Sequence, residues 1–172
     1  MNNIKQIAIT GPESTGKSQM ARQLASHFNT VWVPEYAREY LENLGRPYRY
    51  EDILIIGRQQ YQLQKEKLKE ASEFIFYDTD FTVLKIWCEF KYGKCHEWIK
   101  TQFEKQPIDH YLLMNFDLPW EPDPQREHPA KRLELFDLYV NELRNKRSDF
   151  TLISGLGDQR LKHAIEAVEA LR

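Results

Sequence analysis

The segment formed by residues 11–18 constrains the fold of this chain more than any other part of its sequence. It reads GPESTGKS and matches the pattern G-x-x-x-x-G-K-[ST] without a mismatch. Glycines at Gly11 and Gly16 permit a tight turn whose backbone N–H groups converge on an anion. A short apolar run precedes the segment and a helical pattern follows it, which is the context that the motif requires. We therefore predict a phosphate-binding loop, called the phosphate loop below.

The phosphate loop is expected to bind a nucleotide through its backbone amides and through the dipole of the helix that follows. Lys17 is expected to reach the β- and γ-phosphates, and the hydroxyl of Ser18 is expected to ligate Mg²⁺. The cofactors that the motif indicates are therefore ATP and Mg²⁺. The predicted nucleotide-binding residues are Gly11, Pro12, Glu13, Ser14, Thr15, Gly16, Lys17 and Ser18.

Short apolar runs alternate with longer helical patterns along the whole chain. Each run is nearly continuous in apolar residues, as expected for strands that are covered on both faces. Strands separated by helices of this length form right-handed βαβ units around a parallel sheet. We predict an α/β, three-layer P-loop NTPase fold with a five-stranded parallel sheet, similar to nucleoside and nucleotide kinases. The expected strands are 4–10, 30–33, 74–77, 110–116 and 150–154, and the expected helices are 17–28, 36–44, 50–71, 82–90, 97–103, 130–144 and 161–171.

Length and charge limit the organisation of the chain and its partners. The 172 residues, of which 41% are apolar, suit one core, so we expect a single domain over residues 1–172. The 24 Lys and Arg residues nearly balance the 26 Asp and Glu residues, which gives no electrostatic reason to expect nucleic acid or a membrane as partner. The first ten residues, MNNIKQIAIT, lack the apolar region of a signal peptide, and two cysteines make no disulfide framework. We expect a cytoplasmic protein with a small-molecule partner, and the oligomeric state stays open.

The third expected strand ends in carboxylates at the edge of the sheet where the phosphate loop lies. In parallel sheets, ligands bind beyond the carboxyl ends of the strands. The run FIFYD closes with Asp78, a pattern in which the carboxylate orders Mg²⁺ or its waters, and Asp80 follows two residues later. Both aspartates can also cap the next helix. We predict that Asp78 holds the metal with Ser18 and that Asp80 contacts the substrate, although Asp80 remains a second candidate for the metal.

Glu35 ends the second expected strand and needs a different role. In the strand order of P-loop kinases, the third strand neighbours the phosphate-loop strand and the second strand lies outside it. Glu35 would then face the γ-phosphate across the cleft, where a carboxylate can orient an acceptor hydroxyl and take its proton. The alternative is a solvated glutamate at a helix N-terminus. Arg38 could bind substrate or pair with Glu35 or Asp52, and Gln59 could face the acceptor or the surface. The predicted substrate-binding residues are Glu35, Tyr36, Arg38, Gln59 and Asp80.

Residues 118–129, LPWEPDPQREHP, contain four prolines. This density excludes a helix interior or a central strand, so a long loop is predicted, and such loops are usually functional. In small kinases this position holds the lid that closes over ATP and brings arginines to the transferring phosphoryl group. We predict a lid at about residues 118–130 with Asp123, Arg126 and Arg132, and the predicted catalytic residues are Lys17, Glu35 and Arg126. An ordinary loop with a solvated arginine is the alternative.

Two tryptophans and the segment after the last expected strand also have structural interpretations. Trp87 and Trp98 are interpreted as core or helix-packing residues. The segment 155–160, which ends in Arg160, follows the last expected strand at the place where such kinases hold adenine, although it also fits a helix cap.

The blocks GPESTGKS, EYAREY, FIFYDTDF and WEPDPQR, in this order and spacing, resemble the ribosylnicotinamide kinase domain of bacterial NAD-biosynthesis regulators. The resemblance covers nearly the whole chain. It implies a P-loop kinase that transfers a phosphoryl group from ATP to nicotinamide riboside, giving nicotinamide mononucleotide. Two alternatives stay open: a kinase of the same build that acts on another nucleoside or nucleotide, and a P-loop regulator that senses ATP without phosphorylating an acceptor.

Overall fold

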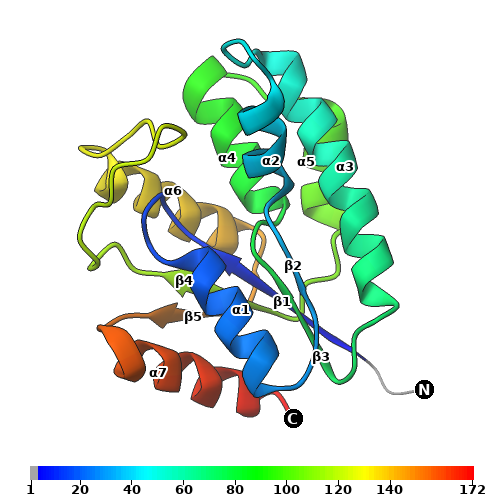
Figure 1. Cartoon of the computed structure of the whole chain (residues 1–172), viewed down its shortest axis with the longest axis vertical. Coiled ribbons are helices and arrows are strands. Elements are labelled where there is room, and N and C mark those ends of the chain that lie inside the picture. Colours follow the sequence, from blue (N-terminus) through cyan, green and yellow to red (C-terminus); the bar gives the residue numbers. More distant parts are fainter. Residues whose placement is uncertain (1–3) are drawn as a thin grey trace.

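A five-stranded parallel sheet forms the centre of the structure. A computed structural model of the chain describes residues 4–172 (Figure 1), and the first three residues of the expected domain lie outside the described residues. The strand order is β2-β3-β1-β4-β5. The strand beside β1 is therefore β3, with β2 outside it, and the predicted fold class is confirmed. The strands are β1 (Lys5–Thr10), β2 (Trp32–Val33), β3 (Phe74–Tyr77), β4 (His110–Met114) and β5 (Phe150–Ile153).

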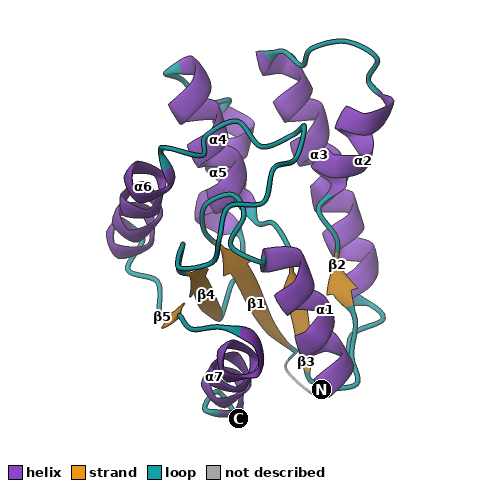
Figure 2. Ribbon diagram, turned by 60° about the vertical axis from the view of Figure 1, so that its left-hand side comes forward, coloured by secondary structure: helices purple, strands orange, loops and turns teal. Residues whose placement is uncertain are grey.

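Helices cover both faces of the sheet, which lies between the two helix layers in Figure 2. The helices α1 and α7 pack on one face, and α3, α4 and α6 pack on the other. The helices α2 and α5 pack against α3 and α4. The helix bounds are α1 (Lys17–His27), α2 (Tyr36–Asn43), α3 (Tyr50–Leu68), α4 (Phe81–Tyr92), α5 (Glu97–Lys105), α6 (Arg132–Asn145) and α7 (Gly157–Glu169).

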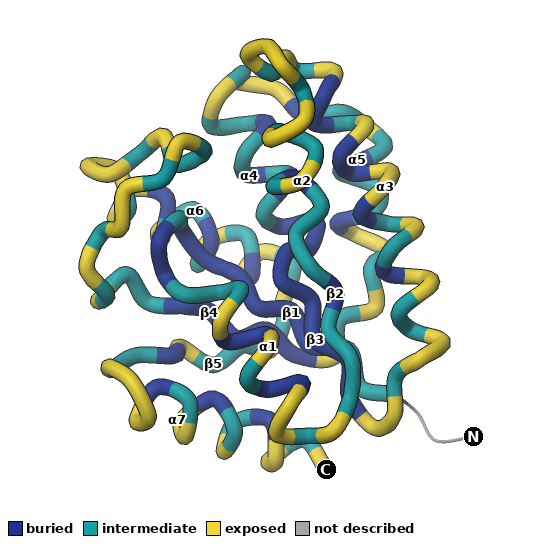
Figure 3. The backbone as a smooth tube through the Cα atoms, in the orientation of Figure 1, coloured by how far each residue is buried: buried dark blue, intermediate teal, exposed yellow. Residues whose placement is uncertain are grey.

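The two-residue period of β1 explains why both helix layers hold to the sheet. Ile7 and Ile9 point into the cluster with α1 and α7, whereas Ala8 between them belongs to the cluster with α4 and α6. All three side chains are fully buried. Figure 3 shows the resulting pattern, with the central strands β1, β3 and β4 mostly dark blue and exposed residues on the outer surfaces of the helices. Among the helices of residues 4–172, none combines the length and the apolar character needed to cross a bilayer.

Several element bounds differ from the sequence-based expectation: α3, for example, ends at Leu68 and not at residue 71, and β4 ends at Met114 and not at residue 116. The strand β2 has two residues rather than four, because only Trp32 and Val33 pair with β3. Thr30, expected in this strand, instead donates its hydroxyl to the carbonyl of Phe74 at 2.6 Å. The helix α7 begins at Gly157, four residues earlier than expected, and therefore includes Arg160. Residues 115–131 contain no helix or strand, as the prolines predict.

A buried carboxylate organises the corner between α2 and α3. Asp52, in the first turn of α3, is 2% exposed. Its carboxylate accepts both terminal nitrogens of Arg46 at 2.8 and 2.9 Å, the hydroxyl of Tyr40 at 2.8 Å and the backbone N–H of Arg49 at 2.7 Å. Hydrogen bonds from Arg46 in particular hold the pKa of Asp52 well below its ordinary value. This network fixes the loop that carries Tyr48, a residue of the site described below.

We predict that Asp52→Asn lowers the free energy of unfolding by about 1–3 kcal/mol at pH 7, because an amide cannot accept all four hydrogen bonds of a buried carboxylate. Urea denaturation followed by circular dichroism measures the change. The neighbouring Glu51→Gln is the matched control, since Glu51 is exposed in the same helical turn. Equal stability of the two variants would contradict the role given to Asp52.

Candidate active site

The phosphate loop connects β1 to α1 at the carboxyl edge of the sheet. Gly11 has φ +137°, and a Cβ at this position would lie 2.8 Å from the carbonyl oxygen of Met114, so only glycine fits. Gly16, at φ +80°, forms the N-cap of α1. Lys17 donates its ammonium group to the carbonyls of Gly11 and Pro12 at 3.0 and 2.7 Å. The loop therefore has the glycine-dependent backbone that the motif predicts.

Three charged groups lie together at this edge of the sheet. Burial lowers the pKa of Lys17, whereas the carboxylates of Glu35 and Asp78 raise it. Burial raises the pKa of Glu35, which lies at the N-cap of α2, and the charges of Lys17 and Arg38 lower it. Burial and the charge of Glu35 raise the pKa of Asp78 to about 7. The predicted gathering of the strand-end carboxylates around Lys17 is therefore present.

Ser18 and Asp78 form a donor set that fits a hard divalent cation. The hydroxyl of Ser18 is close enough to Asp78 to lower its pKa. Asp78 is 2% exposed, and its Oδ1 atom has no hydrogen-bond partner within residues 4–172. Mg²⁺ is usually held by one or two protein oxygens together with phosphate oxygens and waters. Accordingly, the described part of the chain contains no cluster of three or more His, Cys, Asp or Glu side chains that could hold a metal alone.

The position of Glu35 depends on Gln60 of α3. Gln60 is fully buried, accepts the backbone N–H of Tyr36 at 2.8 Å and donates to the carbonyl of Pro34 at 3.0 Å. Gln59, which was expected to face the acceptor, is exposed and does not line the cavity described below. One residue along a helix turns a side chain by about 100°, and this register puts Gln60 rather than Gln59 on the inner face of α3.

Two further residues predicted to bind substrate lie elsewhere. Asp80 is 1% exposed and caps α4, because its carboxylate accepts the backbone N–H and the hydroxyl of Thr82 at 3.0 and 2.5 Å. The helix-capping alternative for Asp80 is therefore the one that the geometry supports. Tyr36 packs with Tyr40 in a shallow surface groove outside the main cavity.

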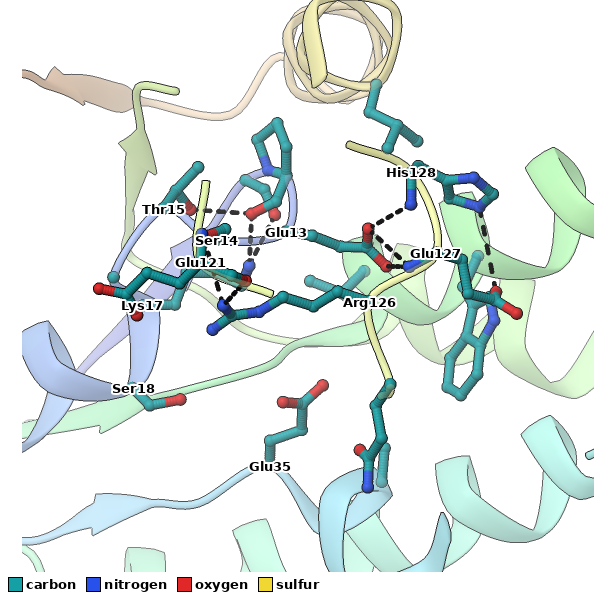
Figure 4. A pocket seen from close by; sticks show the side chains of 18 of the residues that line it. Glu13, Ser14, Thr15, Lys17, Ser18, Glu35, Glu121, Arg126, Glu127 and His128 are labelled. Atoms are coloured by element: carbon teal, nitrogen blue, oxygen red, sulfur yellow. Dashed lines mark hydrogen bonds and ion pairs between the residues drawn. The ribbon is translucent and has the colours of Figure 1, made fainter. Parts of the chain in front are cut away.

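The loop of residues 118–130, called the proline-rich loop, lies against the phosphate loop. The carboxylate of Glu13 accepts the backbone N–H groups of Glu127 and His128 at 3.0–3.2 Å. The hydroxyl of Ser14 accepts the backbone N–H of Glu121 at 2.9 Å and the guanidinium of Arg126 at 3.3 Å. Figure 4 shows Arg126 extending over the phosphate loop, with Glu35 across the cavity from it.

Side chains from other elements also hold the proline-rich loop. Arg38 of α2 forms an ion pair with Asp123 at 3.0 Å. It does not pair with Glu35 or Asp52, the two partners considered from the sequence. Arg132, at the start of α6, donates to the carbonyl of Leu118 at 2.8 Å. The three residues assigned to this loop from the sequence thus act at different points: Asp123 contacts α2, Arg126 covers the phosphate loop and Arg132 anchors the loop's start.

Four side chains connect the far end of the proline-rich loop to the opposite wall. Tyr48 donates its hydroxyl to Glu127 at 2.6 Å, and Lys91 of α4 forms an ion pair with Glu127 at 2.6 Å. The indole N–H of Trp87 donates to the hydroxyl of Tyr48 at 2.9 Å. We call Tyr48, Trp87, Lys91 and Glu127 the latch. Trp87 is therefore a wall residue of the cavity and not only a helix-packing residue.

A cavity of about 520 Å³ lies between the phosphate loop, α2, α4, α6 and the proline-rich loop. One half is polar and contains Lys17, Ser18, Glu35, Arg38 and Arg126. The other half is formed mainly by apolar and aromatic side chains from α4 and α6: Val83, Ile86, Trp87, Phe90, Leu135 and Tyr139. A cavity with a phosphate-binding end and an aromatic end can hold a nucleotide phosphate beside a planar organic group.

The sequence did not indicate the latch or the contacts of Arg160. Tyr48 and Glu127 are 79 residues apart in the chain, and Arg160 and Thr15, which share a hydrogen bond, are 145 residues apart. No local pattern indicates such pairs. The segment that contains Glu127 was indicated as functional by its four prolines and by the adjacent block WEPDPQR.

The raised pKa of Asp78 predicts a stability effect that depends on pH. Between about pH 4 and pH 7 the folded chain keeps a proton that the unfolded chain has released, so the stability contributed by Asp78 falls as the pH rises through this window. Asp78→Asn, which is neutral at every pH, should stabilise the nucleotide-free protein at pH 8 on the order of 1–3 kcal/mol and have little effect near pH 4.

Thermal unfolding of the wild type and of Asp78→Asn, at pH 4.5 and pH 8 in the absence of divalent cations, measures this difference in stability. Asp137→Asn, on the exposed side of α6, is the control. The prediction is wrong if Asp78→Asn is less stable than the wild type at pH 8. In that case the hydrogen bonds of the aspartate stabilise the fold by more than the burial of its charge destabilises it.

Comparisons with known proteins agree with this geometry. A family model described as an AAA domain matches residues 6–160. The trifunctional NAD biosynthesis/regulator protein NadR of Escherichia coli strain K12 is 27% identical over 177 aligned residues, which cover 98% of this chain and 43% of NadR. The chain therefore spans less than half the length of the curated relatives it matches.

Solved structures share the fold. Crystal structures of NadR, one in complex with NAD and AMP-PNP and one in complex with NR, match with a TM-score of 0.80 and 21% identity, covering 97% of this chain and 49% of NadR. Thymidylate kinase from Ehrlichia chaffeensis matches with a TM-score of 0.68 and 12% identity, covering 99% of this chain and all of the kinase. With the family model over most of its length and this fold, the chain belongs to the AAA-domain family and is a P-loop protein built like the nucleoside and nucleotide kinases.

Proposed function

We propose that this chain is a kinase that transfers the γ-phosphoryl group of ATP to the 5′-hydroxyl of nicotinamide riboside, giving ADP and nicotinamide mononucleotide. The observation that carries the proposal is the position of Glu35, which lines the same cavity as Lys17 and Arg126. A carboxylate there is suited to an acceptor, because a nucleotide sensor needs no proton acceptor beside the γ-phosphate. In this proposal the described chain acts as one kinase domain with residues 118–130 as its lid.

The roles follow from the charges. Lys17 and Arg126 neutralise the negative charge that develops on the transferring group, and the guanidinium adds donors in a fixed planar arrangement. As the acceptor oxygen attacks the γ-phosphorus, its proton passes to the carboxylate of Glu35 and the bond to the ADP oxygen breaks. A buried carboxylate with a raised pKa is a better proton acceptor than a solvated one.

Mg²⁺ would be held by Ser18 and Asp78, the donor set that the geometry of β3 and α1 brings together. When bound, the ion would supply positive charge that neutralises the nucleotide phosphates. The ionised form of Asp78 is required for this role, so metal binding is expected to favour loss of its proton near pH 7.

The aromatic half of the cavity supports a nucleoside acceptor with a cationic ring. The aromatic residues Trp87, Phe90 and Tyr139 line the cavity, and so do the carboxylate residues Glu13 and Glu127. A pyridinium ring is attracted by both kinds of group, whereas a neutral base gains only the stacking. The NadR relatives, named for NAD biosynthesis and solved with NR, favour the same acceptor.

A panel of acceptors tests the proposal. ADP formation is measured with Mg²⁺-ATP and nicotinamide riboside, purine nucleosides, pyrimidine nucleosides or deoxynucleosides. We expect fast ADP formation with nicotinamide riboside and with none of the other acceptors. A preference for another nucleoside would reassign the acceptor within the same kinase fold, and slow turnover that ignores every acceptor would favour an ATP-sensing regulator.

Glu35→Gln should lower kcat by roughly 10²–10⁴ while ADP binds with unchanged affinity, because the amide keeps the shape of the side chain but accepts no proton. Turnover and ADP affinity are measured separately on the same preparation. Glu42→Gln, on the exposed face of α2, is the matched control and should behave as the wild type. Loss of ADP binding with little change in kcat would assign Glu35 to the nucleotide instead.

Arg126→Ala should lower kcat by up to roughly 10³ with smaller effects on substrate affinity, because the guanidinium acts on charge that develops in the transition state. Exposed Arg144 on α6 provides the control variant Arg144→Ala. An unchanged kcat in Arg126→Ala would reduce the proline-rich loop to a structural element.

Trp120 offers a second readout of this loop. Trp120 lies within the proline-rich loop, and the centre of its ring is 5.8 Å from the guanidinium carbon of Arg132. Mg²⁺–ATP analogue plus acceptor should change the tryptophan fluorescence of the wild type, since Arg126 must exchange its loop partners for phosphate. The change should become smaller in Trp120→Phe, and the part that remains reports Trp87 in the cavity wall.

A further inference from the structure

Arg160 of α7 is a buried arginine outside the cavity whose contacts all go to loops around the phosphate loop. It is 4% exposed. One terminal nitrogen donates to the carbonyl of Thr15 at 3.1 Å and to the carbonyl of Asn115 at 2.8 Å. The other donates to the carbonyl of Gly155 at 3.0 Å and forms an ion pair with Asp117. One guanidinium thus joins the loops that follow β1, β4 and β5.

The bond to Thr15 has a consequence for the next residue. In a planar trans peptide, the C=O of one residue and the N–H of the next point in opposite directions. Because the carbonyl of Thr15 points toward Arg160, the N–H of Gly16 points away from α7. Gly16 lines the cavity and caps α1. A charged donor on the carbonyl also polarises the peptide, which makes the N–H of Gly16 a stronger donor to an anion.

The remaining contacts hold Arg160 in place. Asp117 accepts Arg160 through Oδ1 and the backbone N–H of Gly155 through Oδ2, the latter at 2.7 Å. Asn115 donates to the hydroxyl of Ser154 at 3.1 Å, which joins the same two loops a second time. The two terminal nitrogens of the guanidinium thus reach four acceptors, an arrangement that the single nitrogen of a lysine cannot reproduce.

We propose that Arg160, held by Asp117, is a positioning residue for phosphate binding: it orients the Thr15–Gly16 peptide so that the N–H of Gly16 faces the nucleotide phosphates. The inference rests on the nucleotide binding assumed in the proposed function and is independent of the acceptor. It assigns a binding role to a side chain that touches no ligand itself.

The test compares Arg160→Lys with a matched variant, Arg172→Lys. Arg172 also contacts a carboxylate through two nitrogens, that of Glu73, but it touches no residue of the phosphate loop or of the loops that cover it. Circular dichroism checks folding of both variants. Titration calorimetry without acceptor then gives the Kd for ADP and for pyrophosphate, a probe that contains only the phosphate part of the ligand. The amide resonance of Gly16 in a proton–nitrogen correlation spectrum reports its hydrogen bond to phosphate.

We expect Arg160→Lys to raise the Kd for ADP and for pyrophosphate by similar factors, roughly tenfold or more, which is the scale of one charge-assisted hydrogen bond. The shift of the Gly16 amide on ADP binding should shrink in the same variant. Arg172→Lys should change both Kd values less than twofold. A folded Arg160→Lys protein that binds both ligands like the wild type would overturn the inference.

Asp117→Asn keeps the test valid if Arg160→Lys does not fold. The side chain of Asp117 is 31% exposed, and asparagine can still accept the N–H of Gly155 while its pairing with Arg160 is weakened. A several-fold rise in both Kd values supports the inference, and unchanged values contradict it. If the wild type binds neither ADP nor pyrophosphate, the proposed function itself fails and the positioning role fails with it.

Discussion

Parallel hydrogen bonding between β1 and β3 is the constraint on which the candidate site depends. The register pairs Ala8 with Tyr77, so the phosphate loop after β1 and Asp78 after β3 leave the sheet side by side. Pairing of β2 with the outer side of β3 then brings Glu35 to the same edge. Antiparallel neighbours would send these loops to opposite ends of the sheet. The whole arrangement of opposite charges therefore follows from strand direction and strand order.

The charges of Lys17, Glu35 and Asp78 shift one another's pKa values. Lys17 is desolvated, which disfavours its ammonium form, and the nearby Glu35 and Asp78 oppose that effect. The two carboxylates repel each other, which raises the pKa of Asp78 further. A triphosphate with a divalent cation adds both signs of charge to this set, so binding and the protonation of Asp78 are coupled. The same desolvation that makes burial of these charges unfavourable strengthens their electrostatic effect in the proposed phosphoryl transfer.

The proline-rich loop lies over the cavity through contacts with three separate elements. Glu13 holds its backbone from the phosphate loop, Arg38 holds Asp123 from α2, and Lys91 holds Glu127 from α4. Residues of this loop line the cavity together with the phosphate loop. In the proposed reaction, exclusion of water from the cavity favours an organic hydroxyl over water as acceptor.

Features that depend on local sequence pattern and on strand direction could be predicted from the sequence. The phosphate loop follows from one motif, and the strands follow from apolar runs of the right length. The strand order, which decides where Glu35 and Asp78 lie, was taken from P-loop kinases and is the order observed. The interpretations of Gln59 and Asp80 depended on side-chain direction, which a shift of one helical residue or one capping bond decides. Trp87 and Arg160 were underestimated because their partners lie far away along the chain and act through tertiary contacts that no periodicity records.

The central claim is that the γ-phosphoryl group goes from ATP to a nucleoside and not to water. Phosphorus NMR of a reaction with Mg²⁺-ATP and nicotinamide riboside tests it most directly. The account predicts a new phosphomonoester resonance that grows in equal amount with ADP, while inorganic phosphate stays near its level without enzyme. ADP matched by inorganic phosphate, with no phosphomonoester, would contradict the account.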